Sequence, residues 1–130
     1  MAIHVTKIKP EFTDERGYIS RIVDQEKIKI RSVLEITGRP GSVRGNHYHK
    51  KDMHYVYCLK GKFRYSEKDI KDPKSKIESV ILKPGDLVLT KPMKAHSMKF
   101  IENTVFLAIT TETRNQKAYE KDLVRVVITK

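Results

Sequence analysis

Apolar and polar residues alternate along most of this chain in short runs, and the runs end at glycine, proline or asparagine. Such alternation is typical of β-strands that turn one face to a core and the other to solvent. The pattern predicts strands over residues 3–8, 18–23, 32–36, 54–59, 62–65, 78–82, 87–90, 97–101, 104–110 and 123–128.

The polar stretch 66–76 predicts a loop, and only residues 114–121 favour a turn or two of helix. About ten short strands with almost no helix indicate an all-β sandwich or barrel. No linker, internal repeat or low-complexity segment interrupts the pattern, and 130 residues are enough to bury a core. We therefore expect a single domain over residues 1–130.

Composition narrows the class of protein. Hydrophobic residues at 38% and charged residues at 33% are typical of a globular chain. The longest apolar run, residues 105–109, is too short to cross a bilayer, and residues 1–7 lack the apolar segment of a signal peptide. One cysteine, Cys58, excludes an internal disulfide. We expect a cytoplasmic protein that is not associated with a membrane.

The net charge is +11, and such a field attracts phosphate groups on a nucleic acid, a nucleotide sugar or an anionic membrane. A surface rich in lysine, glutamate and isoleucine, as in heat-adapted proteins, explains the charge equally well. The basic residues are spread along the whole chain, which argues against nucleic acid as the partner.

Three of the five histidines lie within eight positions. On a strand, His47 and His49 lie on the same face. His54 follows five residues later, and His96 could reach the group from a further strand. Imidazole nitrogens bind zinc, iron, copper and nickel, and imidazole is also a proton-transfer group near neutral pH. The alternative is an ordinary solvated histidine face.

The spacing of these residues resembles the first motif of the cupin family. Gly41 is followed after five residues by His47 and His49, then after four by His54 and after six by Gly61. Cupins usually carry Glu at the position of His54. The second cupin motif is matched only at Gly85 and His96; Lys91, Met93 and Phe100 stand where the family has Pro, Gly and Asn.

This resemblance implies an all-β, single-domain cupin, which is a double-stranded β-helix or jelly-roll barrel. It also implies a divalent metal ion (zinc, iron, nickel or manganese) held by His47, His49, His54 and His96. The alternative is a metal-free cupin in which the same histidines handle protons.

Three shorter stretches resemble enzymes that act on sugar nucleotides. Residues 12–20 read FTDERGYIS, which is similar to the opening of 3,5-epimerases. Residues 44–51 read RGNHYHKK and residues 56–61 read VYCLKG, which resemble dTDP-4-keto-6-deoxyhexose 3,4-ketoisomerases. The segment GNHYH, residues 45–49, also resembles a zinc-containing cupin domain that epimerises C3 of UDP-4-keto sugars.

The resemblance implies a homodimeric isomerase or epimerase of a nucleotide-linked 4-keto sugar in polysaccharide biosynthesis. It makes His47 and His49 catalytic, and makes Arg31 and Arg44 substrate-binding. Arg16 is also expected to bind substrate, because arginines can supply bidentate contacts to a pyrophosphate. Two positions depart from the ketoisomerases, because Val33 replaces a site tyrosine and His54 replaces a glutamine.

Two other functions remain open from the sequence. One is a metal-dependent dioxygenase or isomerase of a small keto or enol substrate, which needs an open coordination position and a compact apolar pocket. The other is a non-catalytic module that binds sugar or metal.

Overall fold

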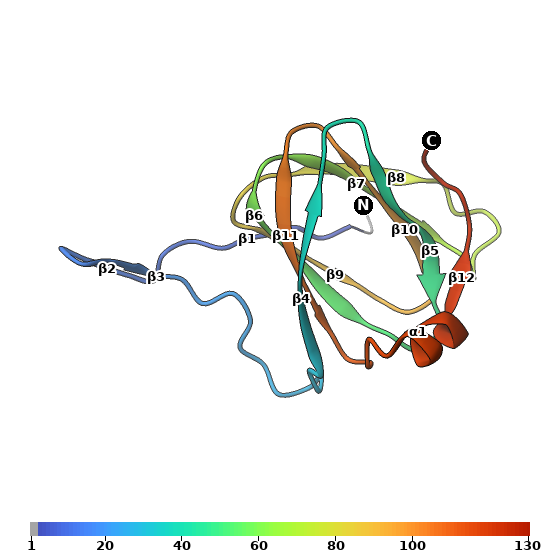
Figure 1. Cartoon of the computed structure of the whole chain (residues 1–130), viewed down its shortest axis with the longest axis horizontal. Helices are drawn as coiled ribbons and strands as arrows, with labels where there is room; N and C mark the ends of the chain where they lie inside the picture. The colour runs from blue at the N-terminus through green and yellow to red at the C-terminus, as the bar shows by residue number, and fades with distance from the viewer. Residues whose placement is uncertain (1–2) are drawn as a thin grey trace.

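Ten of the strands form two five-stranded antiparallel sheets that face each other across a shared core (Figure 1). The computed structural model describes residues 3–130. The β6 sheet runs in the order β1 (Thr6–Lys7), β9 (Asp86–Thr90), β6 (His54–Lys60), β11 (Thr104–Thr110), β4 (Ser32–Gly38). The β5 sheet runs in the order β12 (Leu123–Arg125), β5 (Val43–His49), β10 (Lys94–Phe100), β7 (Phe63–Asp69), β8 (Glu78–Leu82). Strands β4 to β7 lie in alternate sheets, and the predicted all-β jelly roll is confirmed.

Aromatic side chains from both sheets meet in the interior. Phe63 and Phe100 come from β7 and β10, Phe106 comes from β11 in the other sheet, and their ring centroids lie 5.4 to 6.1 Å apart. All three are at most 2% exposed, and burial of such a side chain contributes about 1.5–3 kcal/mol. The remaining core side chains are Ile3, Val56, Cys58, Tyr65, Leu82, Val88 and Met98. Met98 and Phe106 of this core also line a cavity that contains the clustered histidines.

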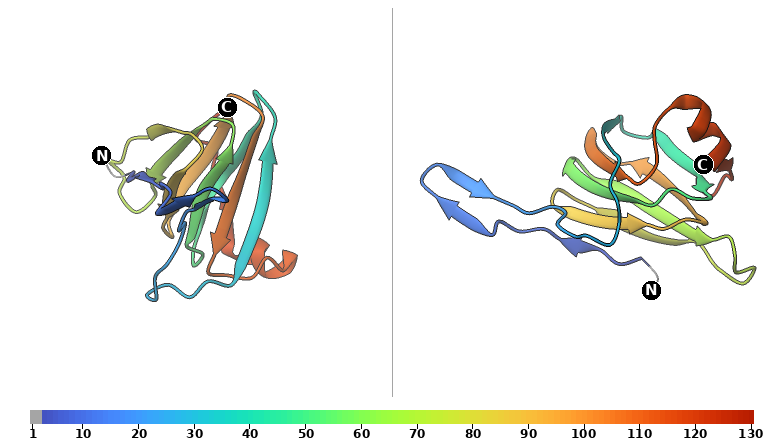
Figure 2. Two further views of the ribbon diagram at one scale, coloured as in Figure 1. Left: turned by 90° about the vertical axis from the view of Figure 1, so that its left-hand side faces the viewer. Right: turned by 90° about the horizontal axis from the view of Figure 1, so that it is seen from below.

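A two-stranded hairpin, β2 (Phe12–Asp14) and β3 (Gly17–Ile19), projects away from the two sheets (Figures 1 and 2). The strand predicted over residues 18–23 is observed as the shorter β3, which ends at Ile19. Strand β2 was not among the predicted ranges. Phe12, Tyr18 and Ile19 are 51%, 68% and 61% exposed. These large apolar side chains are exposed to solvent because the hairpin extends beyond the sheets.

The polar stretch 66–76 is only partly a loop, because β7 continues to Asp69. Ser66 and Glu67 are buried, and each has a polar partner: the Ser66 and Ser79 hydroxyls lie 2.8 Å apart, and Tyr65 donates to Glu67 at 2.7 Å. Hydrogen-bonded polar residues can continue a strand through an interior that composition alone predicts to be apolar.

The predicted helical turn at 114–121 is observed as α1 (Gln116–Asp122). It begins where the Asn115 side chain accepts a hydrogen bond from the backbone N–H of Ala118. Among the described residues no helix is long and apolar enough to span a membrane.

Two glycines of the first histidine motif provide a matched test of the fold. Gly41 and Gly61 both have positive φ, at 83° and 90°. A Cβ at Gly41 would meet nothing within 4 Å, whereas one at Gly61 would collide with the Asn103 carbonyl and with Thr104. We expect Gly41→Ala to lower the free energy of unfolding by about 1–2 kcal/mol, the cost of left-handed backbone, and Gly61→Ala to lower it further. Urea denaturation of both variants measures the difference; equal losses would contradict the predicted collision.

Candidate functional site

Four histidines from three strands gather between the two sheets. His47 and His49 lie on β5, and His96 lies directly opposite His47 on the adjacent strand β10. His54 opens β6 and reaches the group from the facing sheet. The ring of His47 lies 5.0 Å from that of His49 and 4.7 Å from that of His96, and the His54 and His96 rings lie 5.2 Å apart. All four line one cavity of about 210 Å³.

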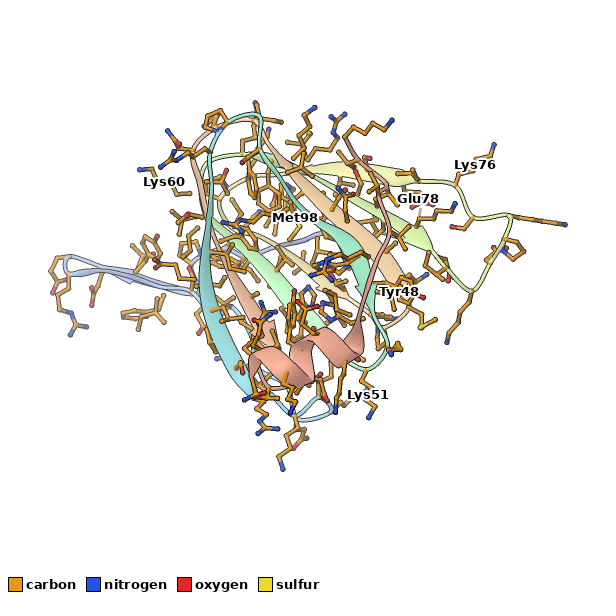
Figure 3. All side chains as sticks on the ribbon, turned by 45° about the vertical axis from the view of Figure 1, so that its right-hand side comes forward. Tyr48, Lys51, Lys60, Lys76, Glu78 and Met98 are labelled. Carbon is orange, nitrogen blue, oxygen red and sulfur yellow. The ribbon has the colours of Figure 1, made fainter. Side chains whose placement is uncertain are left out.

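A β-bulge in β5 decides which side chains face this cavity. Ser97 is paired with Gly45 and the preceding residue, His96, is paired with His47, so Asn46 is an extra residue on β5. A bulge of this kind re-aims the side chains on its two sides. Arg44 is the register partner of Met98, which lies inside the body (Figure 3). Arg44 therefore lines the cavity together with His47, although strict alternation would place the two on opposite faces.

Three of the imidazoles are oriented by an acceptor at Nδ1. The distance from Nδ1 is 3.1 Å to the Asp122 carboxylate for His49 and 2.7 Å to the Asp52 carboxylate for His54. For His96 the acceptor is the Lys94 carbonyl oxygen, at 3.1 Å. Because these oxygens only accept, each Nδ1 carries a hydrogen, and the neutral form of each ring therefore has its lone pair at Nε2. The cavity therefore presents acceptors, which suit a substrate hydroxyl or an acidic C–H.

Burial favours the neutral form of His47, His49 and His96. It lowers the pKa of His47 to about 3, and the neighbouring His49 and His54 lower it further in the same direction. Burial also lowers the pKa of His96 well below the ordinary value. Burial and His54 lower the pKa of His49, but the charges of Asp52 and Asp122 oppose this shift. Among the three, His49 has carboxylates that favour its protonated form.

Asp52 itself sits between two opposing effects. Burial pushes its pKa upward, but the hydrogen bond from His54 and the charges of His54 and His49 bring the net pKa below the ordinary value. Asp52 therefore remains ionised next to His54, as expected of a carboxylate that orients an imidazole.

The segment around α1 adds two residues that the sequence did not single out. The ring of Tyr119 lies 5.6 Å from that of His49, and the Arg114 guanidinium lies 4.0 Å above the Tyr119 ring. Both line the histidine cavity and also an adjoining cavity of about 380 Å³. Four cationic side chains surround that second cavity: Lys50, Lys51, Arg114 and Lys121. Lys51 is seen beside α1 in Figure 3.

The predicted arginines lie in three different places. Only Arg44 is at the cavity, where its Nε donates to the Thr37 carbonyl at 2.8 Å. Arg31 is exposed at the entry to β4, where its backbone N–H donates to the Thr110 carbonyl. Arg16 is on the projecting hairpin, paired with Asp14 at 2.6 Å.

Comparison with known proteins agrees with this geometry. Residues 1–128 match the family described as FdtA: WxcM-like, C-terminal. The chain is similar in structure to a double mutant of the QdtA 3,4-ketoisomerase from Thermoanaerobacterium thermosaccharolyticum in complex with TDP, at 30% identity, a TM-score of 0.72, and 95% coverage of this chain and 86% of that chain. No curated protein sequence matches the chain.

More distant structures share the fold. The dTDP-4-dehydrorhamnose 3,5-epimerase from Sulfolobus tokodaii has a TM-score of 0.79 at 19% identity, covering 98% of this chain and 78% of that chain. The RmlC epimerase of Mycobacterium tuberculosis has a TM-score of 0.81 at 16% identity, covering 96% of this chain and 68% of that chain.

These comparisons correct one prediction. The expected divalent metal ion, whether zinc, iron, nickel or manganese, is wrong, because the similar epimerases and ketoisomerases act without a metal cofactor. Nitrogens of His47, His49 and His96 do lie within 4.8 Å of one another. Convergent imidazoles serve proton transfer as well as coordination, so the motif spacing did not discriminate between the two.

The low histidine pKa values predict how stability depends on pH. Below the ordinary histidine pKa of 6.5 the unfolded chain binds a proton at His47 that the folded protein excludes until about pH 3. The free energy of unfolding should therefore fall as the pH is lowered through this window. We expect His47→Gln to flatten the decline and the exposed His4→Gln to leave it unchanged, as measured by urea denaturation between pH 4 and 7. Identical slopes for the wild type and His47→Gln would refute the assignment.

Proposed function

The chain belongs to the family described as FdtA: WxcM-like, C-terminal, and on that premise we propose that it isomerises or epimerises a nucleotide-linked 4-keto sugar. The observation that carries the proposal is the pair formed by buried His49 and Asp122, because His49 lies beside His47 in a cavity that Arg44 also lines. The 30% identical ketoisomerase structure in complex with TDP supports the same substrate class.

The first step is removal of the proton from C3 of the sugar. The C4 carbonyl acidifies this C–H bond, and the His49 Nε2 lone pair takes the proton while the C–H electrons form a C3–C4 double bond. Asp122, at 3.1 Å from Nδ1, holds the ring and stabilises the imidazolium that forms. The developing enolate at O4 needs a hydrogen-bond donor. The Arg44 guanidinium, which comes from β5, lines the same cavity and can donate to this oxygen.

The second step decides the product. If His49 returns its proton to C4 while a neighbouring base takes the proton from O3 and passes it to O4, the result is a sugar with a ketone at C3 and a hydroxyl at C4. His47 is that neighbouring base, since its ring lies 5.0 Å from His49 on the same strand face. Clustering of the imidazoles in one group favours proton return on one face of the sugar, and hence 3,4-ketoisomerisation over epimerisation at C3.

The diphosphate needs cations outside the histidine cavity. The adjoining cavity shares His49, Arg114 and Tyr119 with the histidine cavity and is bordered by lysines. Arg114 offers bidentate contacts to phosphate oxygens, and Tyr119 holds its guanidinium in place by stacking. The role of Arg31 in substrate binding stays a prediction.

Arg16 can serve in substrate binding only if it acts on another copy of the chain, because its hairpin projects away from the two sheets that carry the histidines (Figure 2). Residues 9–26, which we call the arm, carry five acidic and three basic side chains, a net charge of −2. The rest of the chain carries 11 acidic and 24 basic side chains, a net charge of +13. An acidic arm with exposed Phe12, Tyr18 and Ile19 fits the basic body of a second copy. We therefore propose a homodimer in which each arm reaches the partner's site.

Three further expectations belong to this proposal. The enzyme acts in polysaccharide biosynthesis, and it works in the cytoplasm, with which a buried, unpaired Cys58 is compatible. Residues 1–130 form one cupin domain.

Proton transfer is tested by incubating the protein with dTDP-4-keto-6-deoxyglucose in deuterated water. We expect deuterium at the carbons that exchange and a 3-keto product by NMR. His49→Asn should lower turnover by about 10²–10⁴-fold, the usual contribution of a general base, and Asp122→Asn should lower it as well. The matched control is His4→Asn, an exposed histidine away from the cavity. Absence of exchange, or full turnover in His49→Asn, would count decisively against the proposal.

The arm is tested by mixing two inactive variants, Arg16→Ala and His49→Asn. If Arg16 serves the partner's site, a mixed dimer contains one complete site, and about a quarter of the sites recover after random subunit exchange. If Arg16 serves its own site, the mixture stays inactive. Light scattering of the separate variants should first show dimers; a monomeric wild type would refute the dimer.

A further inference from the structure

We propose that Asn46 and residues 126–129 form a positioning device, the tail clasp, which holds the β5 bulge and thereby aims Arg44 and His47 into the cavity. Its catalytic consequence rests on the proposed function, but its structural consequence does not.

The clasp consists of short hydrogen bonds between one side chain and the segment after β12. Asn46 Oδ1 accepts from the backbone N–H groups of Ile128 at 2.9 Å and Thr129 at 3.0 Å. Asn46 Nδ2 donates to the Thr129 carbonyl at 2.8 Å. The backbone N–H of Val126 donates to the Asn46 carbonyl at 2.8 Å. The Asn46 amide oxygen and nitrogen are thus both committed to the tail.

A second contact ties the same tail to the opposite strand. The hydroxyls of Ser97 and Thr129 lie 2.6 Å apart. Ser97 is the β10 residue at which the register shifts, and it follows His96 directly. The tail therefore touches both strands at the bulge, next to His47 on one strand and His96 on the other.

The backbone at the bulge needs such support. Asn46 has a φ of 56°, in the left-handed region that a non-glycine residue occupies at a cost, although asparagine tolerates it better than most. Gly45 has a φ of 85°, and a Cβ there would lie 2.8 Å from the His96 carbonyl oxygen. If β5 kept all its residues but paired regularly without the bulge, strict alternation would turn Arg44 away from the face that carries His47.

The effect of Asn46 on chemistry is indirect. Gly45 and His47, on either side of it, line the histidine cavity, whereas the Asn46 side chain is directed to the tail. Asn46 is therefore a positioning residue, and a displacement of about 1 Å in the groups that it aims is enough to lower a rate by 10²-fold.

Two substitutions separate the clasp from the backbone. Asn46→Gly keeps a residue that favours positive φ but removes all three side-chain hydrogen bonds, whereas Asn46→Asp keeps the acceptor for Ile128 and Thr129. We expect Asn46→Gly to lower kcat by about 10–100-fold, with a smaller change in KM. Asn46→Asp, which cannot donate to the Thr129 carbonyl, should regain part of the turnover. Ser97→Ala, which loses only the contact with Thr129, should give an intermediate loss.

Gly41→Ala is the control, because it strains a positive-φ position away from the clasp and should leave kcat unchanged below its Tm. The second readout needs no substrate: the imidazole nitrogen resonances of His47 and the Nε resonance of Arg44 should shift in Asn46→Gly and return part of the way in Asn46→Asp. Wild-type kcat and unshifted resonances in Asn46→Gly would overturn the clasp. If the wild type is inactive on 4-keto sugars, the proposed function fails, and the resonances alone decide on the clasp.

Discussion

The pairing of β5 with β10, interrupted by one extra residue at Asn46, is the constraint on which the site depends. Regular pairing places His47 opposite His96, and the bulge adds Arg44 to the same face. A cation and two imidazoles thus reach one cavity from two adjacent strands, without any long loop. The tail contacts of Asn46 and Ser97 are significant for the same reason, since they hold the position at which the two strands change register.

Burial lowers the pKa of the cavity histidines, and nearby carboxylates oppose this shift at His49. Four imidazoles in a confined interior disfavour added positive charge, and so His47 and His96 remain neutral. His49 differs because two carboxylates oppose the effect of burial on its pKa. A base must bind a proton during turnover, and the carboxylates make His49 the imidazole best placed to do so. The remaining rings can then act as acceptors for hydroxyl groups of the sugar.

The metal prediction was wrong for an informative reason. Spacing within a motif describes which side chains converge, and convergence of Nε2 lone pairs suits a proton as well as an ion. The carboxylates behind His49 and His54 do not separate the two chemistries either, because the same partner orients a metal ligand and a catalytic imidazole. Only the comparison with metal-free epimerases and ketoisomerases distinguished them.

Local features of the sequence were sufficient for the fold class and for much of the histidine cluster, since alternation and motif spacing are properties of neighbouring residues. The predicted helix and most of the strands are present, although β2 and β5 were missing from the predicted ranges because their apolar alternation is weak or is broken by the bulge. Asp122 joins His49 across 73 positions of the chain, and Tyr119 and Arg114 arrive with it. Likewise, Arg16 was predicted to bind substrate, but it lies on the projecting hairpin between β2 and β3. Such partners are determined by the packing of the two sheets and by the pairing of β12 with β5, which brings α1 next to His49. These contacts join distant parts of the chain, so no short stretch of sequence predicts them.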